Sequence, residues 1–141
     1  MASDDTSTST PIDHLNNALG FRLISATRDE VIIEWDVGPQ HRQPMGIVHG
    51  GVYCAAIEST CSIGATVDAM ERFGRHAVGL ENHTSFIRAI RDGKLRATAT
   101  PITRGKNTQV WEAKVTDEAG GTVATGRVRL YCLESLPTVT V

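Results

Sequence analysis

Hydrophobic patterning divides the sequence into one central helix and a set of strands. Between Gly51 and Met70 most positions are apolar or small, and Glu58 and Asp68 are the only charged residues. A helix this apolar is expected to be buried on nearly all sides. The flanking stretches instead alternate between apolar and polar residues, or are rich in β-branched residues, which is typical of strands.

The strand pattern predicts two strands before the helix and four after it. The expected strands are Phe21–Ala26, Val31–Val37, His76–Ile90, Lys94–Thr103, Thr108–Thr116 and Thr122–Leu133. The first two should form a hairpin around Thr27–Glu30, and the short turns between the later strands imply antiparallel pairing. A short helix is predicted over Ile12–Leu19, and an irregular loop over Gly38–Gly46.

One buried helix and about six antiparallel strands predict an α+β fold in which the sheet curls around the helix. The length of 141 residues suits one domain, which we place at residues 12–141. Residues 1–11 are mostly Ser, Thr and Asp and have no apolar face. A disordered tail is therefore expected there.

Composition narrows the classes of partner. The 14 basic residues are balanced by 16 acidic ones, so a nucleic-acid partner is not expected. No apolar run approaches the length of about 20 residues that a membrane span requires, and we expect a cytoplasmic protein without a membrane partner. Three cysteines without a C-x-x-C pair predict reduced thiols, and the five histidines lack metal-binding spacing.

The glycine pair Gly50-Gly51 lies where the long helix is expected to begin. Free N–H groups and the positive end of the helix dipole are exposed at such an end, which can bind an anion or polarise a carbonyl oxygen. Paired glycines also simply permit a tight turn into a helix. The two interpretations are equally compatible with this segment alone.

Glu58 is the charged residue at the middle of the predicted helix. Its neighbours one turn away are Cys54, Ala55, Cys61 and Ser62, so no Lys or Arg on the same helix can pair with it. Burying a carboxylate disfavours its charged form, and such a group suits general-base or nucleophilic work near neutrality. The alternatives are an ion pair with Arg88, Arg91 or another distant residue, or an exposed helix face.

The spacing of these two candidates indicates an assembly. Gly50 and Glu58 are eight residues apart, which is about 12 Å along a helix. One chain cannot easily bring both to a single reacting carbon. If both act on it, Gly50 of one subunit must meet Glu58 of another, and the catalytic unit is a symmetric dimer.

His49-Gly50-Gly51 followed by Glu58 resembles the hot-dog-fold acyl-CoA thioesterases of the phenylacetate-pathway and Arthrobacter-type 4-hydroxybenzoyl-CoA kinds. The resemblance extends over roughly residues 12–134 and includes the strand segment from Gly79 to Arg88. It implies a hot-dog fold, in which a curved antiparallel sheet wraps one long helix. It also implies homodimers that pair their sheets, and often homotetramers.

The resemblance assigns roles to five residues. Gln43 matches a residue that orients the thioester, and Gly50 matches the glycine whose N–H bonds the thioester oxygen. Glu58 matches the acid that attacks or activates water from the other subunit. Ser62 stands where that family has a threonine that orients water or the acid, and His49 is expected to shape the loop by hydrogen bonding.

Coenzyme A requires positive charge near its phosphates, and the resemblance points to Arg88 and to the polar turn that follows Thr103. The predicted substrate-binding residues are Gly51, Asn82, Arg88, Arg104, Gly105, Lys106 and Asn107. A turn this polar is equally compatible with plain solvent exposure.

The resulting prediction is an acyl-CoA thioesterase that releases a free acid and coenzyme A, with an aromatic or medium-chain acyl group. No cofactor is expected, because coenzyme A is part of the substrate. The alternatives are a non-catalytic acyl-CoA-binding module and a hot-dog hydratase or dehydratase. A Cys54 nucleophile is not expected, because no histidine lies within one helical turn of it.

Overall fold

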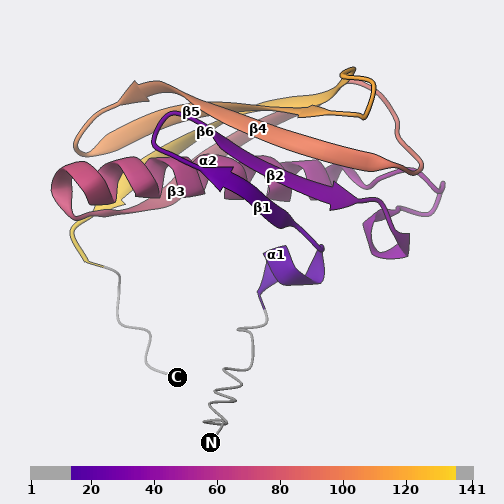
Figure 1. The fold of residues 1–141 in the computed structure, drawn as a ribbon, viewed down its shortest axis with the longest axis horizontal. Helices are drawn as coiled ribbons and strands as arrows, with labels where there is room; N and C mark the ends of the chain where they lie inside the picture. Colours follow the sequence, from indigo (N-terminus) through magenta and orange to yellow (C-terminus); the bar gives the residue numbers. More distant parts are fainter. Residues whose placement is uncertain (1–13, 136–141) are drawn as a thin grey trace, which may run out of the picture.

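All six predicted strands pair into one antiparallel sheet, and the long helix lies across one of its faces (Figure 1). The computed structural model describes residues 14–135. Its helices are α1 (Leu15–Ala18), the 3-10 helix η1 (Pro39–His41) and α2 (Gly50–Phe73). Its strands are β1 (Arg22–Ala26), β2 (Val31–Asp36), β3 (His76–Phe86), β4 (Lys94–Arg104), β5 (Thr108–Thr116) and β6 (Thr122–Leu133). The strand order is β1-β2-β4-β5-β6-β3, which confirms the predicted antiparallel α+β architecture.

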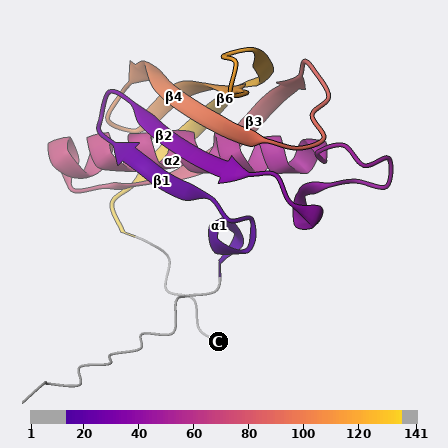
Figure 2. The same cartoon turned by 45° about the vertical axis from the view of Figure 1, so that its right-hand side comes forward.

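The sheet curves around α2, as the two views in Figures 1 and 2 show. Alternate side chains of β4 and β5 face the helix and are buried, while their neighbours are more exposed. The buried apolar residues on these strands are Leu95, Ala97, Ala99, Trp111, Ala113 and Val115. Because side chains alternate between the two faces of a strand, one face can be apolar and cover the helix while the other stays polar.

The helix and the sheet approach each other closely at Gly64. A Cβ on Gly64 would overlap the indole ring of Trp111, which is fully buried. Trp111 donates its Nε1–H to Gln109 Oε1 at 2.8 Å, so its polar atom is also satisfied. The glycine therefore lets the helix lie against the largest side chain of β5.

A polar cluster fixes the C-terminal half of α2. Asp68 is fully buried and accepts hydrogen bonds from Arg28, Arg72 and Gln109 at 2.6–3.0 Å. Burial by itself raises the pKa of Asp68, but the hydrogen bond and charge of Arg72 and the other partners outweigh burial and hold that pKa below its ordinary value. These bonds connect the helix to β5 and to the turn between β1 and β2.

Several predicted boundaries move. The helix begins at Gly50 and continues to Phe73, where Gly74 ends it with a φ of 65°. The strand after it ends at Phe86 instead of Ile90, because the N–H groups of Ile87 and Arg88 both bond to Val123 O and the chain turns away. The first helix covers only Leu15–Ala18.

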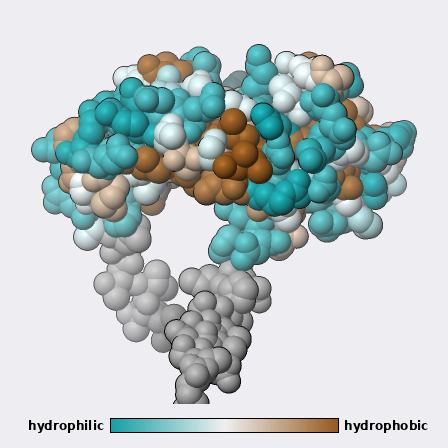
Figure 3. Space-filling view, viewed as in Figure 1, coloured by the Kyte–Doolittle hydropathy of each residue, from teal (hydrophilic) through white to brown (hydrophobic). Residues whose placement is uncertain are grey.

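The prediction that α2 is buried on nearly all sides is wrong. The sheet covers one face of the helix, and Met70 on another face keeps 42% of its surface exposed. The edge strand β1 is likewise exposed along its length, with Leu23 and Ile24 each about half exposed. Apolar surface gathers over β1 and β2 at the middle of the face seen in Figure 3. A single curved sheet leaves one side of the helix without a covering layer.

Strand β3 forms the edge of the sheet opposite β1. It pairs with β6 on one side, and its other edge is free within residues 14–135. The register of this pairing shifts between Gly79 and Glu81, which marks a β-bulge. The bulge lies opposite the middle of α2 and shapes the candidate site described below.

The predicted tail at residues 1–11 lies outside the described residues. The same holds for residues 12–13 and 136–141 of the predicted domain. In the described part of the chain, no helix combines the length and the hydropathy needed to cross a membrane.

Candidate active site

Glu58 lies on the side of α2 that faces β3 and is half-buried. Its Oε2 accepts a hydrogen bond from Asn82 Nδ2 at 3.1 Å. Its Oε1 lies over Gly79, where a Cβ would overlap the carboxylate. The ion pairs found within residues 14–135 do not include Glu58. A neutral amide, and no cation, therefore holds this carboxylate.

The two arginines considered as partners of Glu58 bond elsewhere. Arg88 forms an ion pair with Asp117, and Arg91 donates to Met45 O at 3.3 Å. The hydrogen bond from Arg88 holds the pKa of Asp117 below its ordinary value. The alternative of an ion pair between Glu58 and either arginine is therefore not found.

Asn82 is held on both sides. Its Nδ2 donates to Cys54 O at 3.0 Å as well as to Glu58, and its Oδ1 accepts from Thr84 Oγ1 at 2.6 Å. Placing the amide oxygen toward two other oxygens would be repulsive, so these neighbours determine which way the amide points. The site thus contains an oriented amide that the sequence analysis assigned only to substrate binding.

The N-terminus of α2 is formed by His49 and the two glycines. His49 is the N-cap, and its Nδ1 accepts a hydrogen bond from Gly51 N–H at 2.8 Å. Gly50 is the first residue of the helix, so no carbonyl group of the helix lies four residues before it to accept its N–H. The helix end therefore presents the Gly50 N–H, while His49 occupies that of Gly51.

A hollow of about 290 Å³ lies in front of this helix end. Gln43, Gly50, Tyr53, Phe86 and Arg88 are among the residues that line it. The ring of Phe86 rests on Gly50, since a Cβ there would lie 2.5 Å from Phe86 Cζ, and its centroid is 6.1 Å from that of Tyr53. The fold therefore brings three of the predicted site residues to one hollow.

Tyr53 is among the residues that line this hollow, and its hydroxyl is unpaired within residues 14–135. The side chain is buried, and its hydroxyl has no hydrogen-bond partner among the described residues. Burial raises the pKa of Tyr53 to about 12, so the hydroxyl remains a donor at neutral pH. A buried hydroxyl without a partner costs about 1–3 kcal/mol, which a ligand with a suitable acceptor would offset.

Two other predicted residues lie close to this region. Gln43 turns its Oε1 back toward its own loop, where it accepts from Met45 N–H. Ser62 is half-buried on α2, one turn after Glu58. The structure thus places Ser62 near the carboxylate and Gln43 near the helix N-terminus.

The remaining predicted residues lie at the opposite end of α2. Arg104 donates to Arg28 O at 2.7 Å and to Asp29 Oδ1 at 2.9 Å. Lys106 lies over the ring of Phe73, and Gly105 closes the turn by bonding to Thr108 O. This turn is separated from Gly50 by most of the helix, about 30 Å.

Asn107 belongs to the same distant turn, where Arg75 donates to its Oδ1 at 2.9 Å. In one chain, therefore, the fold does not bring Arg104, Gly105, Lys106 and Asn107 to the hollow that contains Gly50. The geometry of one subunit therefore does not favour a coenzyme A site that these four residues share with Gly50.

Two of the three cysteines are unsuited to act as nucleophiles. Cys54, Cys61 and Cys132 are all free thiols. Burial raises the pKa of Cys61 and, to a smaller extent, that of Cys132, which keeps both thiols protonated and unreactive. Within residues 14–135 no three His, Cys, Asp or Glu side chains are grouped closely enough to hold a metal ion.

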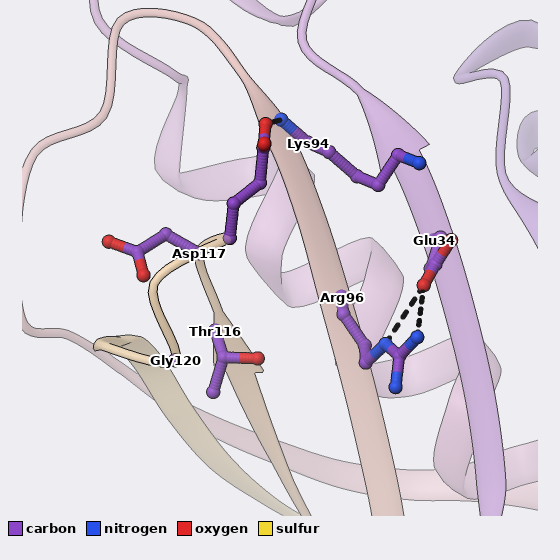
Figure 4. A pocket seen from close by; sticks show the side chains of 7 residues that line it. Glu34, Lys94, Arg96, Thr116, Asp117 and Gly120 are labelled. Carbon is purple, nitrogen blue, oxygen red and sulfur yellow. Dashed lines mark hydrogen bonds and ion pairs between the residues drawn. The ribbon is translucent and has the colours of Figure 1, made fainter.

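A second hollow, of about 440 Å³, lies on the sheet where β2 and β4 meet the turn between β5 and β6 (Figure 4). Two of its carboxylates are in ion pairs, Glu34 with Arg96 at 2.5 Å and Asp117 with Arg88. The third, Glu118, accepts a hydrogen bond from the backbone N–H of Lys94 at 2.8 Å. Groups that are already bonded in this way are less available to a substrate, so the hollow at Gly50 is the better candidate.

Comparison with known proteins identifies the family to which this chain belongs. Residues 45–124 match the thioesterase superfamily. A Mycobacterium tuberculosis protein named as a candidate esterase is 39% identical over 123 residues, which is 86% of this chain and 88% of the relative. This chain belongs to the thioesterase superfamily. The membership confirms the predicted family and the predicted enzyme class, a thioester hydrolase.

Two further comparisons agree with this membership. The solved structure of that Mycobacterium tuberculosis protein has a TM-score of 0.82 and covers 86% of this chain and 98% of its own. A 1,4-dihydroxy-2-naphthoyl-CoA hydrolase of Listeria monocytogenes is 34% identical over 104 residues, or 74% of this chain and 83% of the relative. Similarity in fold and similarity in sequence therefore indicate the same family.

A Staphylococcus aureus thioesterase in the same family has been solved as two alanine variants. The variant at a glutamine has a TM-score of 0.79, 28% identity, and coverage of 85% of this chain and 98% of its own. The variant at a glutamate has a TM-score of 0.78, 28% identity, and coverage of 84% and 98%.

The sequence analysis missed four residues of this region. In the sequence, Tyr53 and Phe86 resemble ordinary core aromatic residues. The hydrophobic pattern around them does not indicate that they line a hollow. Gly79 and Thr84 were quoted only as part of a strand. Gly79 and Phe86 are seven positions apart, an odd interval that would place them on opposite faces of a regular strand. The bulge that brings both to the same face becomes apparent only when β3 is paired.

Proposed function

We propose that this chain hydrolyses an acyl-CoA thioester, with Gly50 and Glu58 acting at the reacting carbonyl. The observation that carries the proposal is the state of Glu58, a half-buried carboxylate held by an amide and not paired with a cation. A structural carboxylate in such a place is normally neutralised by an ion pair. A carboxylate that must attack or take a proton is better left without one.

Each group has a defined part in the reaction. The N–H of Gly50 donates to the thioester carbonyl oxygen and stabilises the negative charge that develops there. Glu58 either attacks the carbonyl carbon, forming an anhydride that water then cleaves, or removes a proton from the attacking water. In both courses the C–S bond breaks, coenzyme A leaves as the thiolate and takes up a proton, and the acyl group leaves as a free acid.

Two subunits are needed to combine these groups. Along β3, Glu58 contacts the Gly79 end and Gly50 contacts the Phe86 end. If the free edges of two β3 strands pair antiparallel about a two-fold axis, the Gly79 end of one strand lies beside the Phe86 end of the other. Glu58 then stands next to Gly50 of the partner subunit. A homodimer with two shared sites is therefore the proposed catalytic unit, and its further assembly into a homotetramer stays a prediction.

The relatives support the same residues. The glutamine and the glutamate replaced in the Staphylococcus aureus thioesterase are separated along that chain by the same interval as Gln43 and Glu58 here. We propose that Gln43 orients the thioester, and that Ser62 orients water or Glu58. The name of the Listeria monocytogenes relative specifies an aromatic acyl-CoA, which supports an aromatic acyl group, with a medium-chain acyl group as the alternative.

The Tyr53 hydroxyl is a further polar group proposed to contact the substrate. Because it is buried and lacks a partner among the described residues, a bound substrate that offers an acceptor would complete its hydrogen bonding. Arg88, which lines the same hollow, supplies the positive charge proposed to meet a phosphate of coenzyme A. The ion pair between Arg88 and Asp117 would have to weaken or break when the phosphate binds.

A thiol-release assay over aromatic and aliphatic acyl-CoAs tests the proposal, with wild type, Glu58→Ala and Glu58→Gln measured in parallel. We expect at least one substrate to be hydrolysed and both variants to lose about 10³-fold or more in kcat. Undiminished turnover by Glu58→Ala would remove Glu58 from the mechanism. Binding without turnover of every thioester would favour a non-catalytic module, and addition of water to an unsaturated acyl-CoA would favour a hydratase.

Subunit complementation tests the shared site. Glu58→Ala and Gly50→Pro are each expected to be inactive, but a hybrid dimer of the two contains one site with an intact Gly50 and an intact Glu58. After subunit exchange, an equal mixture should recover up to about a quarter of wild-type activity. A mixture that exchanges subunits, shown by mass spectrometry, and stays inactive would rule out sharing of these two residues.

A further inference from the structure

Four inward-facing positions of β3 run along α2 between the two proposed reacting groups. Gly79 and Asn82 lie at Glu58, Thr84 follows, and Phe86 lies at Gly50. We propose that Asn82, fixed in turn by Thr84, is the residue that positions the Glu58 carboxylate, and that the bulge after Gly79 creates the seat for it. This rests on the proposed catalytic role of Glu58.

The bulge explains how Gly79 and Asn82 both reach the helix. In a regular strand, side chains alternate between faces, so residues three apart point in opposite directions. The register shift between Gly79 and Glu81 adds one residue and reverses this alternation. From there on, Glu81, His83 and Ser85 share a hollow on the outer surface of the sheet, and Asn82 and Thr84 face α2.

The amide of Asn82 is well suited to orient a carboxylate. One nitrogen donates to Glu58 Oε2 and to Cys54 O, while the amide oxygen accepts from the Thr84 hydroxyl. The side chain therefore cannot rotate to present its oxygen to Glu58 without losing three hydrogen bonds. A neutral donor stabilises the charged carboxylate without adding a positive charge that would oppose attack or proton transfer.

Gly79 completes the seat by its lack of a side chain. Any Cβ there would occupy the space of Glu58 Oε1. With Oε2 bonded to Asn82 and Oε1 lying over bare backbone, the carboxylate has one anchored and one unanchored oxygen. The unanchored oxygen is the one available for reaction. Asn82 is thus a positioning residue, whereas the sequence alone assigned it to substrate binding.

Steady-state kinetics of Asn82→Ala and Asn82→Asp test this assignment, using an acyl-CoA that the wild type hydrolyses. We expect Asn82→Ala to lower kcat by roughly tenfold to a hundredfold, since a misplaced reacting group costs that much, with KM changed less than about twofold. The acid limb of the pH profile of kcat/KM should move upward by about one pH unit, because the lost donor stabilised the anion. Asn82→Asp should move it further, because a second carboxylate repels the first.

The Thr84 pair separates positioning from packing. Thr84→Val keeps the shape of the side chain but removes the hydroxyl that fixes the amide, whereas Thr84→Ser keeps the hydroxyl. We expect Thr84→Val to reproduce a part of the Asn82→Ala shift in the acid limb and Thr84→Ser to restore it. Ser85→Ala, on the same strand but facing outward, serves as the control and should leave kcat and the pH profile unchanged.

The outcomes distinguish this inference from the proposed function. If Glu58→Ala retains full turnover, the proposed function itself fails. If Glu58→Ala is inactive but Asn82→Ala raises KM alone, with kcat and the acid limb unchanged, Asn82 binds substrate and the positioning role is overturned. As a control for folding, the thermal unfolding midpoint of Asn82→Ala should be close to that of the wild type. A loss of folded protein would lower the rate at every pH but would not shift the acid limb.

Discussion

Glu58 Oε1 occupies the space that a side chain on Gly79 would fill, so that the carboxylate of α2 lies directly on the backbone of β3. The contact joins α2 to the strand whose outer edge is free within residues 14–135. Because the same strand contacts Gly50 through Phe86, its geometry sets the positions of both proposed reacting groups. Substitutions along this line are therefore expected to change activity more than stability.

Gly79→Ala should lower kcat by roughly tenfold to a hundredfold, because the added methyl group displaces the carboxylate. In a Glu58→Asp background, whose shorter side chain withdraws from β3, the same substitution should change kcat by less than about twofold. A double-mutant cycle in kcat measures this coupling. Equal effects of Gly79→Ala in both backgrounds would show that the close approach does not matter for the reaction.

Gly50→Pro and Gly50→Ala form a matched pair. Both add a Cβ that meets the ring of Phe86, but only proline removes the N–H. Proline is tolerated at the first position of a helix, and the preceding residue, His49, already has the extended conformation that proline favours, with φ −64° and ψ 133°. We expect the proline variant to lose about 10²–10³-fold more kcat than the alanine variant. Equal losses would mean that the Gly50 N–H does not stabilise the reacting oxygen.

Arg88→Met and Lys106→Met test which end of α2 meets the nucleotide of coenzyme A. Arg88 lines the hollow at Gly50, whereas Lys106 lies over Phe73 at the other end. We expect Arg88→Met to raise KM for acyl-CoA about tenfold, the loss of one charge-assisted contact, and to leave KM for the matching N-acetylcysteamine thioester unchanged. If Lys106→Met produces this selective effect instead, the nucleotide binds at the distant turn.

Acidification should destabilise the protein through Asp68. Its pKa is below the ordinary value in the folded state, so its contribution is complete above the unfolded value of about 3.9 and is lost as the pH falls through the folded value. Asp68→Asn should lower the free energy of unfolding by about 3 kcal/mol at pH 7 and flatten its decline below pH 4.

Urea unfolding at pH 7, 5, 4 and 3 measures the effect of Asp68→Asn, with Asp36→Asn as the matched control. Asp36 forms an exposed ion pair with Arg22, which is worth at most about 1 kcal/mol. Equal losses for the two variants at pH 7 would contradict the role assigned to the buried cluster.

Local pattern was sufficient to locate the elements of this protein. Alternation predicted the four strands after the helix, and their observed bounds differ by at most a few residues. The largely apolar stretch predicted α2, and the absence of a cation one turn from Glu58 singled out that carboxylate. Each of these features depends on residues within about two helical turns, so that the sequence itself contains the signal.

Only the tertiary structure decided how these elements meet. Strand β3 pairs with β6, the last strand of the chain, and not with β4, which follows it. The bulge that turns Asn82 toward Glu58 follows from that pairing, and the same strand brings Phe86 to the hollow at Gly50. The position of Arg104 at the far end of α2 follows from the pairing of β4 with β5. Strand order and register are set by packing summed over the whole sheet and helix. No local window of sequence contains that sum, so the residues that hold Glu58 became apparent only in the folded chain.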